Sequence, residues 1–267
     1  MSNQRSVTFV VPSCGSSGIL ESNFLASPCL RGFHPHQVLV QRDFVSASKA
    51  YNDAIDQAAN DLLVFAHQDV IFPEPWISQL ERVVDCLDSE EPNWGVLGCY
   101  GVTGDGGYRG YVHSPLNGIM GRPFERPAPI QTLDEMVLVL RKSSGLRFDE
   151  RLPHFHLYGT DICLRAAQMG MKSYAISAFC IHNANHYLVL PEEFYECCRH
   201  IKRVWKDYLP IYTSCVSISR FNIPLYRRRF GEAYLRYIRR QALLAPRAKN
   251  VSDLLDQVDA ALHERSA

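Results

Sequence analysis

Long hydrophobic runs are missing from this sequence. No stretch reaches the length of about eighteen apolar residues that a helix needs to cross a bilayer. The N-terminus also lacks the apolar core of a signal peptide, because the run at residues 7–11 is too short. We therefore expect a cytoplasmic protein, with attachment to the inner face of a membrane as the one membrane association left open.

Paired cysteine motifs and glycine-rich nucleotide motifs are missing as well. The nine cysteines form no CxxC pair and show no spacing with histidine that suits zinc, so we expect free thiols in a reducing compartment. Residues 12–18, after the first predicted strand, match neither GxGxxG nor the P-loop, which argues against a dinucleotide-binding dehydrogenase. The same loop lacks a basic residue, so a nucleotidyltransferase stays only an alternative.

A net charge is also absent, but the charges are unevenly distributed. The 28 Lys and Arg residues balance 28 Asp and Glu residues. Residues 199–267 hold 14 basic and 6 acidic residues, whereas residues 1–198 hold 14 and 22. We therefore divide the chain into a main domain, residues 1–190, and a basic helical C-terminal segment, residues 191–267. No nucleic-acid partner is expected.

Short apolar runs alternate with amphipathic stretches in the main domain. The run at residues 62–66 is continuous, as expected for a strand buried on both faces, and residues 46–59 and 74–87 show helical spacing. This alternation predicts an α/β fold, a mostly parallel sheet flanked by helices. Residues 101–131 show little periodicity and are predicted to be a long loop. The predicted strands are residues 7–11, 37–40, 62–66, 94–100, 136–140 and 173–176.

Polar or small residues follow the first three predicted strands. They are Pro12, Ser13, Asp43, His67, Gln68 and Asp69. Ligands of open α/β sheets bind outside the carboxyl ends of the strands, so we expect these residues to face a bound donor molecule.

Six short motifs follow one another between residues 52 and 182. They are Asn52, seventeen residues before Asp69; His67-Gln68-Asp69; Asp134 with Arg141; Arg147-Phe148-Asp149-Glu150; Asp161 with Arg165 and Gly170; and His182. In this order they resemble the large family 2 of glycosyltransferases, which have the Rossmann-like GT-A fold. The resemblance runs from residue 7 to residue 182.

The resemblance implies an inverting transfer of sugar from a nucleoside-diphosphate sugar, with UDP favoured, to a hydroxyl of a glycan or lipid-linked glycan. His67-Gln68-Asp69 takes the place of the Asp-x-Asp motif, and Asn52 is implied to bind the donor. Asp69 and His182 are implied to hold Mn²⁺ or Mg²⁺, and Mn²⁺ accepts imidazole as well as oxygen ligands. Such a metal stabilises the departing diphosphate.

The sequence departs from the family at two positions. His67 replaces an Asp that normally faces the nucleoside, so a changed nucleoside contact is expected. The catalytic carboxylate usually lies six residues before the arginine, and that position is Gly159. Asp161 is therefore the predicted base, since a helix N-terminus favours its charged form. A purely structural role as helix cap is the alternative.

Other groups on the acceptor side remain candidates for the base. They are Asp134, Glu135, His154 and His156. The missing carboxylate at position 159 also leaves a second class of function open, a module that binds sugar nucleotides or glycans without turnover.

Basic and apolar residues alternate through residues 199–249. This pattern is typical of a helix at an anionic membrane surface, and it fits equally well a face that packs against the acidic main domain. A final amphipathic stretch at residues 251–262 could dock in cis or form a homo-oligomer.

Overall fold

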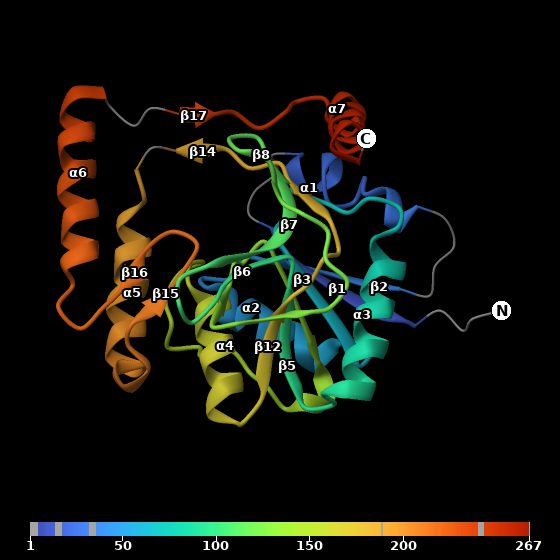
Figure 1. The fold of residues 1–267 in the computed structure, drawn as a ribbon, viewed down its shortest axis with the longest axis horizontal. Helices are drawn as coiled ribbons and strands as arrows, with labels where there is room; N and C mark the ends of the chain where they lie inside the picture. The colour runs from blue at the N-terminus through green and yellow to red at the C-terminus, as the bar shows by residue number, and fades with distance from the viewer. Residues whose placement is uncertain (1–4, 14–17, 32–35, 188, 240–242, 267) are drawn as a thin grey trace.

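The computed structural model describes residues 5–13, 18–31, 36–187, 189–239 and 243–266. Its centre is a seven-stranded sheet of order β2-β1-β3-β11-β5-β12-β9 (Figure 1). The parallel strands are β1 (Val7–Ser13), β2 (Gln37–Arg42), β3 (Leu62–Ala66), β5 (Trp94–Gly98) and β12 (Lys172–Ala175). The antiparallel strands are β9 (Ala128–Ile130) and β11 (Val137–Arg141). The predicted α/β fold with a mostly parallel sheet is confirmed.

Helices cover both faces of this sheet and enclose two hydrophobic cores. Side chains of β3 alternate between them, since Leu63 and Phe65 join the first core and Val64 joins the second. The first core receives side chains from α2 (Ala47–Gln57), α4 (Tyr158–Gln168) and α5 (Glu192–Val204). The second receives them from α1 (Ile19–Ser22) and α3 (Trp76–Glu90). Short 3₁₀ helices occupy Pro28–Leu30, Lys142–Ser144 and Lys206–Tyr208.

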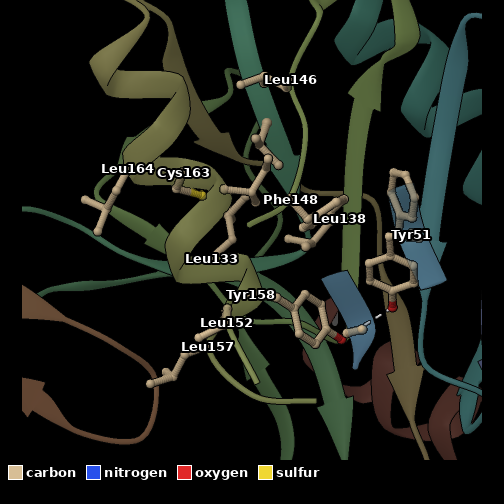
Figure 2. Close-up of a cluster of buried hydrophobic side chains, with 14 of the residues drawn as sticks. Tyr51, Leu133, Leu138, Leu146, Phe148, Leu152, Leu157, Tyr158, Cys163 and Leu164 are labelled. Atoms are coloured by element: carbon tan, nitrogen blue, oxygen red, sulfur yellow. Dashed lines mark hydrogen bonds between the residues drawn. The ribbon is translucent and has the colours of Figure 1, made fainter. Parts of the chain in front are cut away.

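The first core is built around aromatic rings beneath the carboxyl end of β3. The Tyr51 ring lies 4.7 Å from the Phe65 ring, 5.1 Å from the Phe148 ring and 5.3 Å from the Tyr158 ring, measured between centroids. Figure 2 shows Tyr51 and Tyr158 turned toward each other at the edge of this cluster. The packing therefore fixes the Tyr158 hydroxyl at the end of the sheet where a ligand is expected.

A second sheet stands beside the carboxyl ends of the central strands. Its order is β10-β6-β7-β13-β4, and β8 also pairs with β7. The prediction of a loop over residues 101–131 is wrong, because these residues form short hairpin strands whose glycines obscure any alternation. The strands are β4 (Val70–Ile71), β6 (Tyr100–Val102), β7 (Tyr108–Ser114), β8 (Gly118–Gly121), β10 (Thr132–Leu133) and β13 (Cys180–His182).

The C-terminal segment is packed into the rest of the molecule. Phe194, Cys197 and Ile201 of α5 belong to the first core, and Leu254 and Val258 lie in a third core with residues of β4 and β13. Its other elements are β15 (Ile211–Tyr212), β16 (Ser217–Ile218), α6 (Ile223–Arg239), β17 (Leu243–Ala245) and α7 (Val251–Ser266), and β17 pairs with β14 (His186–Tyr187). The domain boundary at residue 190 remains a prediction. In the described part of the chain no helix is long and apolar enough to cross a membrane.

Candidate active site

Strands β3 and β13 bring three predicted site residues together. His67 follows β3 directly, and its amide donates to the Met136 carbonyl at 3.1 Å. After Asp69 the chain enters β4, where Val70 lies opposite His182 of β13. The Asn183 amide also donates to the Asp69 carbonyl at 2.8 Å. Backbone pairing therefore places the side chains of His67, Asp69 and His182 at one point of the sheet edge.

These three side chains form a set that could hold a metal ion. His182 Nε2 lies 3.3 Å from Asp69 Oδ1 and 3.4 Å from His67 Nδ1. One ligand atom from each residue falls within 4.8 Å of the others. Two imidazoles and a carboxylate suit a divalent ion such as Mn²⁺. Instead of standing apart from Asp69 and His182 to face a nucleoside, His67 lies with them.

A chain of hydrogen bonds fixes the orientation of the His67 ring. The Tyr51 hydroxyl donates to Tyr158 Oη at 3.4 Å, and the Tyr158 hydroxyl donates to the Glu135 carbonyl at 3.3 Å. Tyr158 Oη also lies 2.7 Å from His67 Nε2, close enough for a hydrogen bond. When Nε2 carries the proton, Tyr158 Oη accepts its hydrogen bond and Nδ1 presents its lone pair toward His182. Such outer partners commonly set the tautomer of a metal-binding histidine.

Burial and mutual charge set the protonation of this cluster. Burial, together with the nearby His182, lowers the pKa of His67 to about 4, against the opposing effect of Asp69. Burial alone would raise the pKa of Asp69, but His182 holds that pKa below its usual range. Burial alone would lower the pKa of His182, but the nearby Asp69 carboxylate raises this pKa above its usual value. At neutral pH the cluster therefore combines a carboxylate with a neutral imidazole at His67.

Arg247 reaches the same point from the C-terminal segment. Its Nη2 lies 3.6 Å from Asp69 Oδ2, whereas its Nε and Nη1 are buried without a partner among the described residues. Backbone hydrogen bonds hold this stretch: the Arg247 amide donates to Asn185 Oδ1 at 2.9 Å, and the Ala248 amide to Asn183 Oδ1 at 2.7 Å. Two unfilled guanidinium donors beside a carboxylate fit an anionic ligand.

Neither Arg247 nor His186 was predicted from the sequence. His186 lies on β14, where burial, followed by the charge of His182, lowers its pKa. Its Nε2 is buried without a partner in the part of the chain described here. Both residues lie outside the motifs named above. The pairing of β14 with β17 brings His186 close to the segment after β17 that carries Arg247. Long-range pairing of this kind leaves no local signal in the sequence.

The other residues predicted to bind the donor occupy the neighbouring strand ends. Ser13 Oγ donates to Gln68 Oε1 at 3.1 Å, which joins the ends of β1 and β3. Pro12 lies opposite Gln41 in the β1–β2 pair. Asp43 follows β2 as an exposed residue with a left-handed backbone, at φ 63°. These residues all lie at the carboxyl ends of the adjacent strands β1, β2 and β3. Residues 14–17 of the predicted phosphate loop lie outside the described residues.

Asn52, predicted to bind the donor, makes hydrogen bonds within the protein. Its Nδ2 donates to the Phe148 carbonyl and to Glu150 Oε1, both at 3.0 Å, and its Oδ1 accepts from the Phe148 amide at 2.9 Å. These contacts use its amide donors and its acceptor, which argues against a direct contact with a donor. Asn52 fastens the loop of residues 147–150 to α2.

The geometry also speaks against Asp161 as the catalytic base. The residue is fully buried, with Oδ2 2.7 Å from Arg165 Nε and Oδ1 accepting from Trp205 Nε1 at 2.7 Å. Both oxygens are paired, and no surface remains for an acceptor hydroxyl. Its position in the first turn of α4 gave no sign of these partners, because Trp205 is distant in sequence.

The remaining acceptor-side candidates lie around the start of α4. Asp134 accepts from the Met136 amide at 3.1 Å and from Ser214 Oγ at 2.6 Å. The Glu135 carboxylate accepts from the amides of Leu157 and Gly159, while burial and then Asp134 raise its pKa well above the usual value.

His154 and His156 flank the same region on the side of α5. His154 Nε2 lies 2.7 Å from Glu196 Oε2, in a contact near the surface. The His156 ring meets the Phe194 ring edge to face at 5.6 Å. Burial lowers the pKa of His156, so its imidazole is neutral at physiological pH.

Comparison with known proteins gives distant likenesses. No family model matches the chain. A curated protein of Fuscovulum blasticum described as "ATP synthase subunits region ORF 6" is 26% identical over 159 residues. That match covers 55% of this chain and 61% of the relative, so the chain spans less than two-thirds of it.

Solved structures resemble the fold at low identity. TarS of S. aureus, in complex with UDP-GlcNAc, has a TM-score of 0.45 and 16% sequence identity to this chain. The similar region covers 74% of this chain and 66% of the TarS chain. The mannosyltransferase PcManGT of Pyrobaculum calidifontis, in complex with GDP-Man and Mn²⁺, has a TM-score of 0.44 and 12% identity. The similar region covers 67% of this chain and 57% of PcManGT.

Proposed function

We propose that this protein is a glycosyltransferase that moves a sugar from a nucleoside-diphosphate sugar to a hydroxyl of a glycan or lipid-linked glycan. The observation that carries the proposal is the set of His67, Asp69 and His182 at the end of the central strand, with Arg247 beside it. UDP is the favoured nucleotide, and inversion at the anomeric carbon is the favoured outcome.

The residues present fit a divalent metal. The set contains two imidazole nitrogens and a carboxylate oxygen, and Tyr158 bonded to His67 Nε2 leaves Nδ1 as the nitrogen that would ligate. Mn²⁺ suits this mixture better than Mg²⁺, which prefers oxygen ligands. When bound, such an ion supplies positive charge next to the departing diphosphate.

Arg247 would bind the diphosphate of the donor. Its Nε and Nη1 are buried donors without partners in the described residues, and an anion is what satisfies them. The Asp69 carboxylate keeps the guanidinium turned toward the cluster, at 3.6 Å from Nη2. The hydrogen bonds from Arg247 would become stronger as negative charge accumulates on the leaving group. They would therefore stabilise the transition state more than the ground state.

Glu135 would be the base that removes the proton of the acceptor hydroxyl. A Cβ atom at Gly159 would lie 3.1 Å from Glu135 Cγ and 2.8 Å from the Leu133 carbonyl oxygen. The Glu135 side chain therefore fills the space that a carboxylate at position 159 would use. Amides of Leu157 and Gly159 orient its carboxylate, and its raised pKa suits a group that accepts a proton near neutral pH.

Turnover of purified protein tests this proposal. UDP-GlcNAc and GDP-mannose are incubated with Mn²⁺ and a panel of glycan and lipid-linked acceptors, and nucleotide release is measured with water as the alternative acceptor. We expect metal-dependent release of UDP or GDP that Asp69→Asn abolishes and that Asp53→Asn, at a half-buried position on α2, leaves unchanged. Metal-dependent binding of the donor without any release would instead identify a binding module.

A further inference from the structure

Helix α6 stands at one side of the molecule, next to α5 (Figure 1). Its inner face is fixed by Glu232, which is 5% exposed. Glu232 accepts from Tyr195 Oη at 2.6 Å and from Arg228 Nε at 2.8 Å. Arg228 also donates to the Cys215 carbonyl at 2.7 Å. These contacts define which side of the helix faces the protein.

The opposite face of α6 is a stripe of large apolar side chains. Successive members are three or four residues apart, so on a helix of about 3.6 residues per turn they lie on one side, away from Glu232. They are Ile223 (59% exposed), Tyr226 (67%), Phe230 (80%), Tyr234 (61%) and Tyr237 (89%). A continuous exposed apolar stripe of this size marks an interaction surface. We call these five residues the α6 stripe.

The sequence of α6 is basic, and one of its arginines borders the α6 stripe. The sequence of α6 holds five arginines (Arg227, Arg228, Arg229, Arg236 and Arg239) against a single acid, Glu232. Glu232 is buried and paired, and Arg229 pairs with Glu192 of α5 at 2.7 Å. Among the described residues no carboxylate pairs with Arg227, which borders the α6 stripe. The outward side of α6 is therefore apolar at its centre and positive at its margin.

We propose that the α6 stripe docks on an anionic membrane surface, with the helix lying parallel to the bilayer plane. Tyrosine rings suit the headgroup region because one end is apolar and the other polar. Arginine beside them binds lipid phosphate and lets its alkyl stem rest on the apolar layer. The helix would lie on the membrane without crossing it, as amphipathic helices of this composition do.

The charge pattern favours lipid over a second copy of the chain. Two α6 helices packed stripe to stripe would bring together two basic helices, each with five arginines and a single acid that is buried. Anionic lipid supplies the missing negative charge. The inference does not depend on the proposed chemistry, because none of these residues belongs to the candidate active site.

A tryptophan placed on the α6 stripe gives a direct test. The native Trp76, Trp94 and Trp205 are buried, at 0%, 0% and 4% exposure, so Phe230→Trp adds the exposed reporter. We expect its emission to shift to shorter wavelength with phosphatidylcholine–phosphatidylglycerol vesicles, and brominated lipid to quench it. Vesicles of phosphatidylcholine alone should produce a much smaller shift, and added salt should reverse binding. An unchanged spectrum with anionic vesicles overturns the proposal.

Paired substitutions distinguish vesicle binding through the α6 stripe from nonspecific hydrophobic adsorption. Phe230→Ser with Tyr237→Ser should weaken co-sedimentation with the anionic vesicles by on the order of tenfold or more, because two buried aromatic contacts are lost. Leu116→Ser with Met169→Ser, at positions 43% and 51% exposed on other elements, should leave binding unchanged. Equal binding by the first pair and wild type overturns the proposal, as does a wild-type dimer that the first pair converts to monomer.

Discussion

The side chain of Glu135 lies where a side chain at Gly159 would have to begin. A Cβ atom on Gly159 would approach Glu135 Cγ to 3.1 Å and the Leu133 carbonyl oxygen to 2.8 Å. The two positions are thus linked sterically: glycine at 159 permits glutamate at 135. A longer side chain at position 159 would therefore meet both Glu135 and the backbone of Leu133.

Replacing Glu135 with Gln should remove the base while keeping the size of the side chain. We expect turnover to fall by about 10²–10⁴-fold, the usual contribution of a general base, while the affinity for the nucleotide stays within about twofold of wild type. Asp161→Asn is the matched control, because Asp161 is buried and bonded to Arg165 and Trp205. Loss of turnover in Asp161→Asn with full activity in Glu135→Gln would reverse these two roles.

Glu135 should also make stability depend on pH. Its pKa in the folded state is raised by burial and by Asp134, so folding favours the protonated form. Stability from this group is present at acid pH and is lost as pH rises through the raised pKa. Glu135→Gln cannot ionise, so its thermal midpoint should exceed that of wild type increasingly as pH rises from the ordinary glutamate pKa of 4.5 toward the raised pKa. If the thermal midpoints of the two proteins change equally with pH, the raised pKa of Glu135 is contradicted.

Replacing Arg247 with Gln should weaken binding of the diphosphate. Losing charged hydrogen bonds from Nε and Nη1 is expected to weaken UDP or GDP affinity by about 10- to 100-fold. Affinity for the corresponding nucleoside should not change, because a nucleoside carries no phosphate. Titration calorimetry measures both, with Arg82→Gln on the exposed side of α3 as the control. An equal loss of nucleoside affinity would indicate that Arg247 acts on the fold.

Asn52→Ala should affect stability and leave donor binding intact. The substitution removes the bonds to the Phe148 amide and carbonyl, which costs roughly 2 kcal/mol or more when buried groups lose their partners. The thermal midpoint should fall by several degrees, while the folded variant binds nucleotide as wild type does. A stable variant with weakened nucleotide binding would restore Asn52 to the donor site.

The sheet was predictable because its signals are local. Residues 62–66 are apolar without interruption, and a strand buried on both faces requires that. Asp69 and His182 were placed together correctly by the resemblance, since the order of motifs reflects the order of strand ends. The hairpins of residues 101–131 escaped prediction, because strands of three or four residues with glycine show no readable alternation.

The rest of the site depends on contacts between distant segments. Arg247 reaches Asp69 across 178 positions of sequence, through the β14–β17 pair. The proposed role of Glu135 depends on the close packing of Leu133 and Glu135 against Gly159 of α4. The burial of Asp161 was not predictable for the same reason, since its partner Trp205 comes from beyond α5. Spacing along the chain carries no record of such packing.

Binding of UDP and GDP with and without Mn²⁺ tests most directly whether His67, Asp69, His182 and Arg247 form a site for a nucleoside diphosphate and a metal. Titration calorimetry on wild type, Asp69→Asn and the control Asp53→Asn is sufficient. The predicted result is tight binding of at least one nucleotide that requires Mn²⁺, survives in Asp53→Asn and is lost in Asp69→Asn. Nucleotide binding that is equal in all three proteins and independent of the metal would contradict it.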